Sequence, residues 1–227
     1  MDGAIDRVIN TVLRRRRIRA LRRHEIHDLA ADIAYYKPRE AYMTVASTVA
    51  ADLIDRRRLR TALEVGPHLR PVIVGADTME LEPNDALSAT SHLLVHDATS
   101  TPWPVEDKAY DLFVALQVFE HFHGHQPEAF REVRRVARHA ILSLPIDWVM
   151  ADPANCHHQL SNDRVLSWFA PVTPTRIVLG NGGPKKRLLY VFEDLRAPDG
   201  AVGDGVGAEG APGTTQPDVR ESGASVR

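Results

Sequence analysis

Apolar residues recur at helical spacing through the first sixty positions of the chain. Two runs of them are Ile5, Val8, Ile9, Val12 and Leu13, followed by Ile18, Leu21, Ile26, Leu29 and Ile33. Steps of three to five residues align such side chains along one face of a helix. Lys37-Pro38 interrupts the pattern, because proline lacks an amide proton and disfavours a helical residue before it. A further run extends from Tyr42 to Ile54, so we expect two or three helices within residues 1–60.

The pattern changes at Thr61, where short apolar runs alternate with polar or proline-containing segments. Seven of these runs have the length and composition of strands, at residues 62–65, 78–81, 92–96, 112–116, 140–144, 176–179 and 188–192. Amphipathic helices are predicted over residues 127–138 and 163–169. Strands that alternate with helices indicate an α/β fold, in which helices cover both faces of a mainly parallel sheet.

The length of 227 residues suits one α/β domain of moderate size. We expect an N-terminal helical extension over residues 1–60, the main domain over 61–197 and a disordered tail over 198–227. The tail holds seven of the fourteen glycines and no aromatic residue, so it cannot bury enough apolar surface to offset the entropy of ordering. A single cysteine, no apolar stretch of membrane-spanning length and no signal-peptide pattern indicate a cytoplasmic protein.

Three groups of residues near the ends of predicted strands could carry chemistry. The first strand ends in Glu64-Val65-Gly66, where glycine permits a tight turn close to a ligand. The third leads into Asp97-Ala98 and the sequence Pro102-Trp103-Pro104, and residues 110–121 read Tyr-Asp-Leu-Phe-Val-Ala-Leu-Gln-Val-Phe-Glu-His. Ligands of parallel α/β sheets bind beyond the carboxyl ends of the strands, so we expect the site there.

Together with residues 130–136 and the strand after them, these motifs resemble the class I methyltransferases that use S-adenosylmethionine, over roughly residues 61–195. The resemblance implies a Rossmann-like sheet of seven strands. It also implies that Glu64 and Gly66 hold the methionine part of the cofactor and that Glu80 or Glu82 binds the ribose hydroxyls. By the same resemblance, Asp97 and Ala98 address the adenine, while Leu116 and Gln117 form the wall near the transferable methyl group.

The chain departs from the family pattern after Gly66, because His68 and Arg70 stand where the family has glycines. These side chains are expected to narrow the space for the cofactor. The interval between Gly66 and Glu80 is also short for a complete intervening helix. A pseudoenzyme with this fold is therefore an alternative hypothesis.

Methyl transfer to a hydroxyl needs a base, because an alcohol keeps its proton at neutral pH. Histidine is the candidate, since its free pKa lies nearest to neutrality. His157 and His158 follow the fifth predicted strand and resemble the family segment that lines the acceptor site, so either could be the base, with Asp147 in the same loop. The alternative is that both histidines cap the next helix or face solvent.

Four other residues are candidates for acceptor binding, namely Tyr36, Arg39, His121 and Trp148. Tyr36 and Arg39 could close the pocket, and Trp148 could stack on a sugar ring; core packing is the alternative for the aromatic residues. Sugar methyltransferases that resemble this sequence use magnesium, which suggests Asp147, Asp152 or Glu120 as ligands. The spacing of His121, His123 and His125 does not match a familiar zinc motif.

These features favour an O-methyltransferase acting on a small polar acceptor, with a sugar or oligosaccharide hydroxyl, such as that of a methylmannose precursor, as the first hypothesis. A lipid or polyketide acceptor is an alternative. Residues 1–60 carry fourteen Lys or Arg against eight Asp or Glu, with a basic run at 14–17, so a nucleic-acid-binding module with a degenerate fold is another. The apolar faces of the first helices could cover the sheet or form a homodimer.

Overall fold

The computed structural model describes residues 17–195. Within them, seven strands form one sheet in the spatial order β5-β4-β2-β6-β7-β9-β8. The strands are β2 (Ala62–Val65), β4 (Asp77–Glu80), β5 (Leu93–Val95), β6 (Tyr110–Leu116), β7 (Ala137–Pro145), β8 (Arg176–Asn181) and β9 (Arg187–Phe192). All seven strands predicted from the apolar runs are present, and the α/β fold class is confirmed.

The strand directions define the edge of the sheet where a site can form. Strands β5, β4, β2, β6 and β7 are parallel, whereas β9 is antiparallel to both of its neighbours. In the central pair, Val65 of β2 lies opposite Ala115 of β6, so both strands end at nearly the same level. The loops that follow Val65, Glu80, Val95, Leu116 and Pro145 therefore all leave from one edge.

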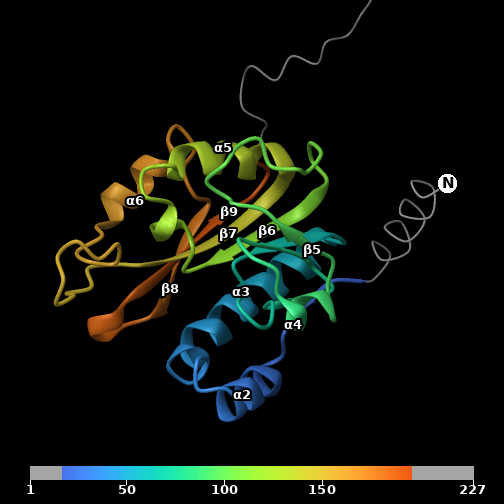
Figure 1. Cartoon of the computed structure of the whole chain (residues 1–227), viewed down its shortest axis with the longest axis horizontal. Helices are drawn as coiled ribbons and strands as arrows, with labels where there is room; N and C mark the ends of the chain where they lie inside the picture. The colour runs from blue at the N-terminus through green and yellow to red at the C-terminus, as the bar shows by residue number, and fades with distance from the viewer. Residues whose placement is uncertain (1–16, 196–227) are drawn as a thin grey trace, which may run out of the picture.

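Helices cover both faces of the sheet (Figure 1). On one face lie α5 (Gln126–Val136) and α6 (Asn162–Phe169); on the other, α3 (Glu40–Arg57) packs on β7 and β8, and α2 (Arg23–Asp32) packs on α3. Each face of the sheet has its own hydrophobic core. Alternate residues of β6 pack into one core or the other, because side chains along a strand point to opposite faces. Phe113 and Ala115 join the core under α5 and α6, while Leu112 and Val114 join the core under α3.

One expected helix is shorter than the apolar pattern predicts. Ile18 and Leu21 were expected to extend the helix that contains Ile26, but residues Arg19–Ala20 form a two-residue strand, β1. This strand pairs antiparallel with β3 (Ile73–Val74), and α2 begins only at Arg23. The long-range pairing satisfies the backbone and still buries Ile18 and Leu21, so burial rather than helicity explains their spacing.

The segment between β2 and β4 contains no α-helix in the described chain, in agreement with its short length. It contains the strand β3 instead. Further short elements are α4 (Asp85–Ser88) and the 3-10 helices η1 (Lys37–Arg39), η2 (Phe119–Phe122) and η3 (Gly183–Lys185). The proline break at Lys37-Pro38 thus becomes η1, which separates α2 from α3.

Several expectations fall outside residues 17–195. They are the helix around Ile5–Leu13, most of the basic run at 14–17 and the tail at 198–227. Of the remaining basic residues, Arg19 forms an ion pair with Glu25 (2.6 Å), which lowers the pKa of that carboxyl to about 2. None of the helices in the described part is long and apolar enough to cross a membrane. The division of the chain into three segments stays a prediction.

Candidate functional site

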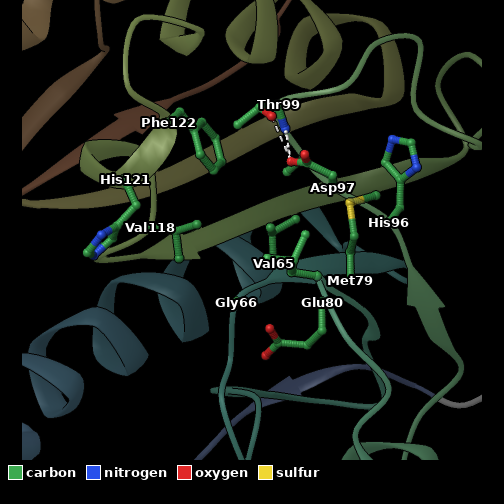
Figure 2. A pocket seen from close by; sticks show the side chains of 12 residues that line it. Val65, Gly66, Met79, Glu80, His96, Asp97, Thr99, Val118, His121 and Phe122 are labelled. Atoms are coloured by element: carbon green, nitrogen blue, oxygen red, sulfur yellow. Dashed lines mark hydrogen bonds between the residues drawn. The ribbon is translucent and has the colours of Figure 1, made fainter.

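The loop after β2 turns sharply at Gly66. Its φ of +67° is a left-handed conformation, and a Cβ there would lie 2.6 Å from Cγ2 of Val118. Both facts require glycine at this position. The turn opens onto a cavity of about 210 Å³, here called the first cavity (Figure 2). Its walls come from the ends of β2, β4 and β5 and the loop after β6, and include Val65, Met79, Glu80, Asp97, Ala98, Val118 and His121.

Two acidic residues line the first cavity. Oδ1 of Asp97 accepts hydrogen bonds from the backbone N–H and the hydroxyl of Thr99, drawn in Figure 2, and these lower the pKa of Asp97. Oε1 of Glu80 accepts from the backbone N–H of His68 (2.9 Å), although burial raises the pKa of Glu80. Within residues 17–195, the second oxygen of each carboxylate has no protein partner, so each can still accept a hydrogen bond from a ligand.

Glu82, the other candidate for the ribose hydroxyls, is exposed and does not line the first cavity. Ala98 does line it, and its carbonyl accepts a hydrogen bond from the indole N–H of Trp103 (3.0 Å). That bond ties the loop after β5 to a buried tryptophan. The geometry therefore selects Glu80 over Glu82 as the candidate for the ribose hydroxyls, whereas the sequence left both open.

Glu64 lies outside the first cavity. Its carboxylate is buried and accepts hydrogen bonds from the backbone N–H groups of Val72 (2.8 Å) and Ile73 (3.0 Å). Burial nevertheless raises the pKa of Glu64 to about 8. Glu64 thus fixes the start of β3, the element that stands in place of a helix after β2.

His68 and Arg70 do not narrow the first cavity, contrary to the expectation. The His68 ring packs against the Tyr35 ring at a tilt of 32°, with ring centroids 4.0 Å apart. Neither side chain is among the residues that line this cavity. The hydroxyl of Tyr36, which is buried, accepts from the backbone N–H groups of Leu69 and Arg70 and so holds the loop after Gly66 in this conformation.

A second cavity, of about 470 Å³, adjoins the first. Residues from η1, the end of β6, the loop after β7 and the β8–β9 connection line it: Tyr35, Pro38, Arg39, Gln117, His121, Trp148, His157, Asn181, Lys185 and Arg187. His121 lines both cavities. Its burial lowers the pKa of the imidazole, which favours the neutral ring. Leu116 lines neither cavity; it borders a third space of only about 20 Å³ beside Tyr36 and Glu64.

The structure distinguishes the two neighbouring histidines. His157 lines the second cavity, whereas His158 pairs with the backbone near Trp148 and its Nδ1 accepts from the N–H of Met150. Asp147 is also outside the cavity lining and forms an ion pair with Lys186 (2.7 Å). Of the three residues considered for catalysis, His157 alone faces either of the two cavities.

The hydrogen-bond partners of His157 indicate which of its ring nitrogens carries the proton. Oδ1 of Asn155 already accepts from the His157 backbone N–H, so ring atom Nδ1 at 2.9 Å must donate to that same oxygen. In the neutral imidazole, Nε2 is then the free acceptor. It lies 3.5 Å from Oε1 of Glu120, a carboxylate whose two oxygens are buried and have no hydrogen-bond partner in the described chain.

Trp148 and Arg39 also line the second cavity, as the sequence analysis proposed. Trp148 is 7% exposed, and its ring contacts Lys185, Arg187 and His157. Sequence reasoning missed Arg187, Lys185, Tyr35 and Asn181. The available signal was the basic run Lys185-Lys186-Arg187 directly before the last strand.

The candidate magnesium ligands Asp147, Asp152 and Glu120 do not gather at one point in the described residues. One group of potential ligands does, namely His121, Cys156 and His157, whose ligand atoms lie within 4.8 Å of one another. Nitrogen and sulfur donors suit zinc, whereas magnesium prefers oxygen. The residues present therefore do not fit magnesium.

One family model and several solved structures are similar to parts of this chain. Residues 64–140 match the family model Methyltransf_11, a methyltransferase domain. No curated protein matches the chain. Similar solved structures include a TehB-like SAM-dependent methyltransferase from Corynebacterium glutamicum, with 14% identity over 59% of this chain and 79% of that chain and a TM-score of 0.45. N-methyltransferase NodS from Bradyrhizobium japonicum has 15% identity over 75% and 97% of the two chains, with a TM-score of 0.48.

The strand order, the glycine turn after β2 and the matched family model define a class I methyltransferase fold. The match of residues 64–140 to a methyltransferase domain indicates S-adenosylmethionine-dependent methyltransferase activity. The first cavity fits the cofactor, because it combines a turn that only glycine can make with two carboxylates that each keep a free acceptor oxygen.

Proposed function

We propose that this methyltransferase modifies a hydroxyl oxygen of a small polar acceptor bound in the second cavity. The observation that carries the proposal is that His121 lines both cavities, so the two cavities adjoin at this residue. Transfer requires the acceptor oxygen in line with the methyl group, and adjoining cavities supply that proximity. S-adenosylmethionine supplies a methyl group that its sulfonium already activates.

Within this proposal, Glu80, Asp97 and Gly66 hold the nucleoside thioether. One oxygen of Glu80 remains free for the ribose hydroxyls and one oxygen of Asp97 for the adenine side. A carboxylate accepts hydrogen bonds from neutral hydroxyls in a charge-assisted geometry. Glu64 supports the same turn from behind through β3.

His157 is the proposed base. As the C–O bond forms and the C–S bond breaks, the acceptor hydroxyl loses its proton to Nε2 of His157. The resulting imidazolium has donors on both ring nitrogens. Nδ1–H already donates to Asn155, and the proton on Nε2 lies on the line to the acceptor oxygen. The positive charge of the ring is then close to Glu120, whose Oε1 lies 3.5 Å from Nε2. A buried carboxylate stabilises the positive ring that forms during the step.

A saccharide hydroxyl is the acceptor class to be tested first, and a methylmannose precursor belongs to it. The lining of the second cavity supports a polar ligand, because Gln117, Asn181, Arg39 and Lys185 offer hydrogen-bonding groups. A lipid or polyketide chain would place apolar surface against these groups, which is unfavourable.

The test is transfer of labelled methyl from S-adenosylmethionine to a panel of mono- and oligosaccharides, with fatty acyl and polyketide acceptors in parallel. The proposal expects label on a saccharide or another small polar hydroxyl compound. Label confined to the apolar acceptors, or to amines, would contradict it.

A further inference from the structure

Three cationic side chains of the second cavity lack an acidic partner. They are Arg39, Lys185 and Arg187, and no ion pair joins any of them to a carboxylate in the described chain. Some other cations of the described chain are paired: Arg56 binds Glu193, Arg135 binds Glu132 and Lys186 binds Asp147. The second cavity, by contrast, gathers three cations in its lining that no ion pair neutralises.

Arg187 is the most constrained of the three. It is 8% exposed, and its guanidinium lies over the rings of Tyr42 (4.5 Å) and Trp148 (4.6 Å). Nε donates to Oε1 of Gln117, and Nη1 donates to Asn181 and to the carbonyl of Lys185. In residues 17–195, Nη2 has no protein acceptor, so a fixed donor remains for a ligand.

Burial of an unpaired guanidinium is unfavourable, and here it lowers the pKa of Arg187. The charge of Glu120 acts on Arg187, but Glu120 does not line the cavity. Lys185 lies 4.4 Å above Trp148, and Arg39 lies 3.7 Å above Tyr35, so both neighbouring cations also rest on aromatic rings. The preorganised cations need an anion to balance them.

We infer that Arg187, Lys185 and Arg39 bind an anionic group, a phosphate or a carboxylate, on the methyl acceptor. Planar arginine and a nearby ammonium recognise the oxygens of such groups. That the anion belongs to the methyl acceptor rests on the function proposed above, whereas the binding of an anion at these cations does not. Trp148 contacts both Arg187 and His157, so the anion subsite and the base lie beside the same indole ring. The acceptor thus carries its anionic group close to the hydroxyl that is methylated.

The test is calorimetric titration of the whole protein, saturated with S-adenosylhomocysteine, with inorganic phosphate, glucose 6-phosphate, glucuronate and glucose. We expect the anionic probes to bind and glucose to bind at least tenfold more weakly. The comparison of phosphate with glucuronate identifies which anion the subsite prefers. Lys185→Gln should weaken anion binding about tenfold, the usual effect of losing one charged hydrogen bond, and Arg187→Gln should weaken it further.

Lys186→Gln is the matched control. It removes the same charge at the next position along the chain, and Lys186 does not line the cavity. Folding of Arg187→Gln is checked by its affinity for S-adenosylhomocysteine. The inference is overturned if no anionic probe binds, if Lys185→Gln and Lys186→Gln behave alike, or if anions bind only without S-adenosylhomocysteine, which would assign the cations to the cofactor carboxylate. If anions bind but no methyl group is transferred, the proposed function is wrong and the anion subsite is still supported.

Discussion

Nε2 of His157 lies 3.5 Å from Oε1 of Glu120, a carboxylate that no hydrogen bond satisfies in the described chain. A buried carboxylate without a partner is unfavourable in a resting structure. Beside a histidine that lines the proposed acceptor cavity, it becomes favourable when the ring gains a proton. This relationship connects a structural anomaly to the proposed methyl transfer.

His157→Ala should therefore lower kcat by roughly 100-fold or more, the usual contribution of a general base. Glu120→Gln should cause a smaller loss in kcat with little change in the KM for the acceptor. Steady-state kinetics with a confirmed acceptor measure both effects. His158→Ala is the control, because that ring accepts from the N–H of Met150 and does not line the cavity. Equal losses in the two histidine variants would contradict the assignment.

Glu80 and Glu82 offer a direct comparison of two nearby acids. Glu80 lines the first cavity, whereas Glu82 is exposed beyond its edge. Glu80→Gln should weaken binding of S-adenosylhomocysteine about tenfold, because a charge-assisted acceptor for the ribose is lost. Glu82→Gln should bind like the unmodified protein. Calorimetry decides between them, and a larger loss with Glu82→Gln would contradict this placement of the ribose.

Glu64 should make stability depend on pH. Its pKa is about 8 in the folded chain, above the usual value of 4.5, so the folded state holds a proton that the unfolded state has released. The free energy of unfolding should therefore fall as the pH rises from about 5 to about 8. Glu64→Gln resembles the protonated carboxyl and should lose less stability over that range. Urea unfolding at both ends measures the difference, and parallel pH curves would contradict it.

Glu193 should show the opposite dependence. Arg56 and Arg57 lower its pKa to about 2, so this stabilisation is present above about pH 4.5 and disappears as the pH falls toward 2. At neutral pH, Glu193→Gln should destabilise the protein by about 1 kcal/mol, since the arginines are partly exposed and screened by solvent. The loss should vanish near pH 2. Glu128→Gln, which breaks an exposed pair with Arg131, should have little effect.

The apolar runs contained enough information for the main sheet. Residues 62–65 were predicted as a strand and are observed as one. A short apolar run between polar turns in an α/β chain is typical of a buried strand. The paired strands β1 and β3 were not predicted. Arg19 and Val74 are neighbours only in space, and no local pattern reports such a pairing.

The site was predictable where it follows strand ends and unpredictable where it depends on side-chain direction. Gly66, Asp97 and His157 were named from their position after strands, and all three line one of the two cavities. Sequence reasoning could not separate His157 from His158, because one position decides which ring faces the cavity. Arg187 was missed because β9 runs antiparallel to its neighbours and so brings its first residue to the edge where other strands end.

Calorimetric titration with S-adenosylhomocysteine tests most directly whether the first cavity holds the cofactor. The unmodified protein should bind one equivalent, and Asp97→Ala should bind at least tenfold more weakly, about 1.4 kcal/mol. Asp55→Ala, which changes an exposed residue of α3, should bind normally. Absence of binding to the unmodified protein, or equal affinity in Asp97→Ala, would contradict the account.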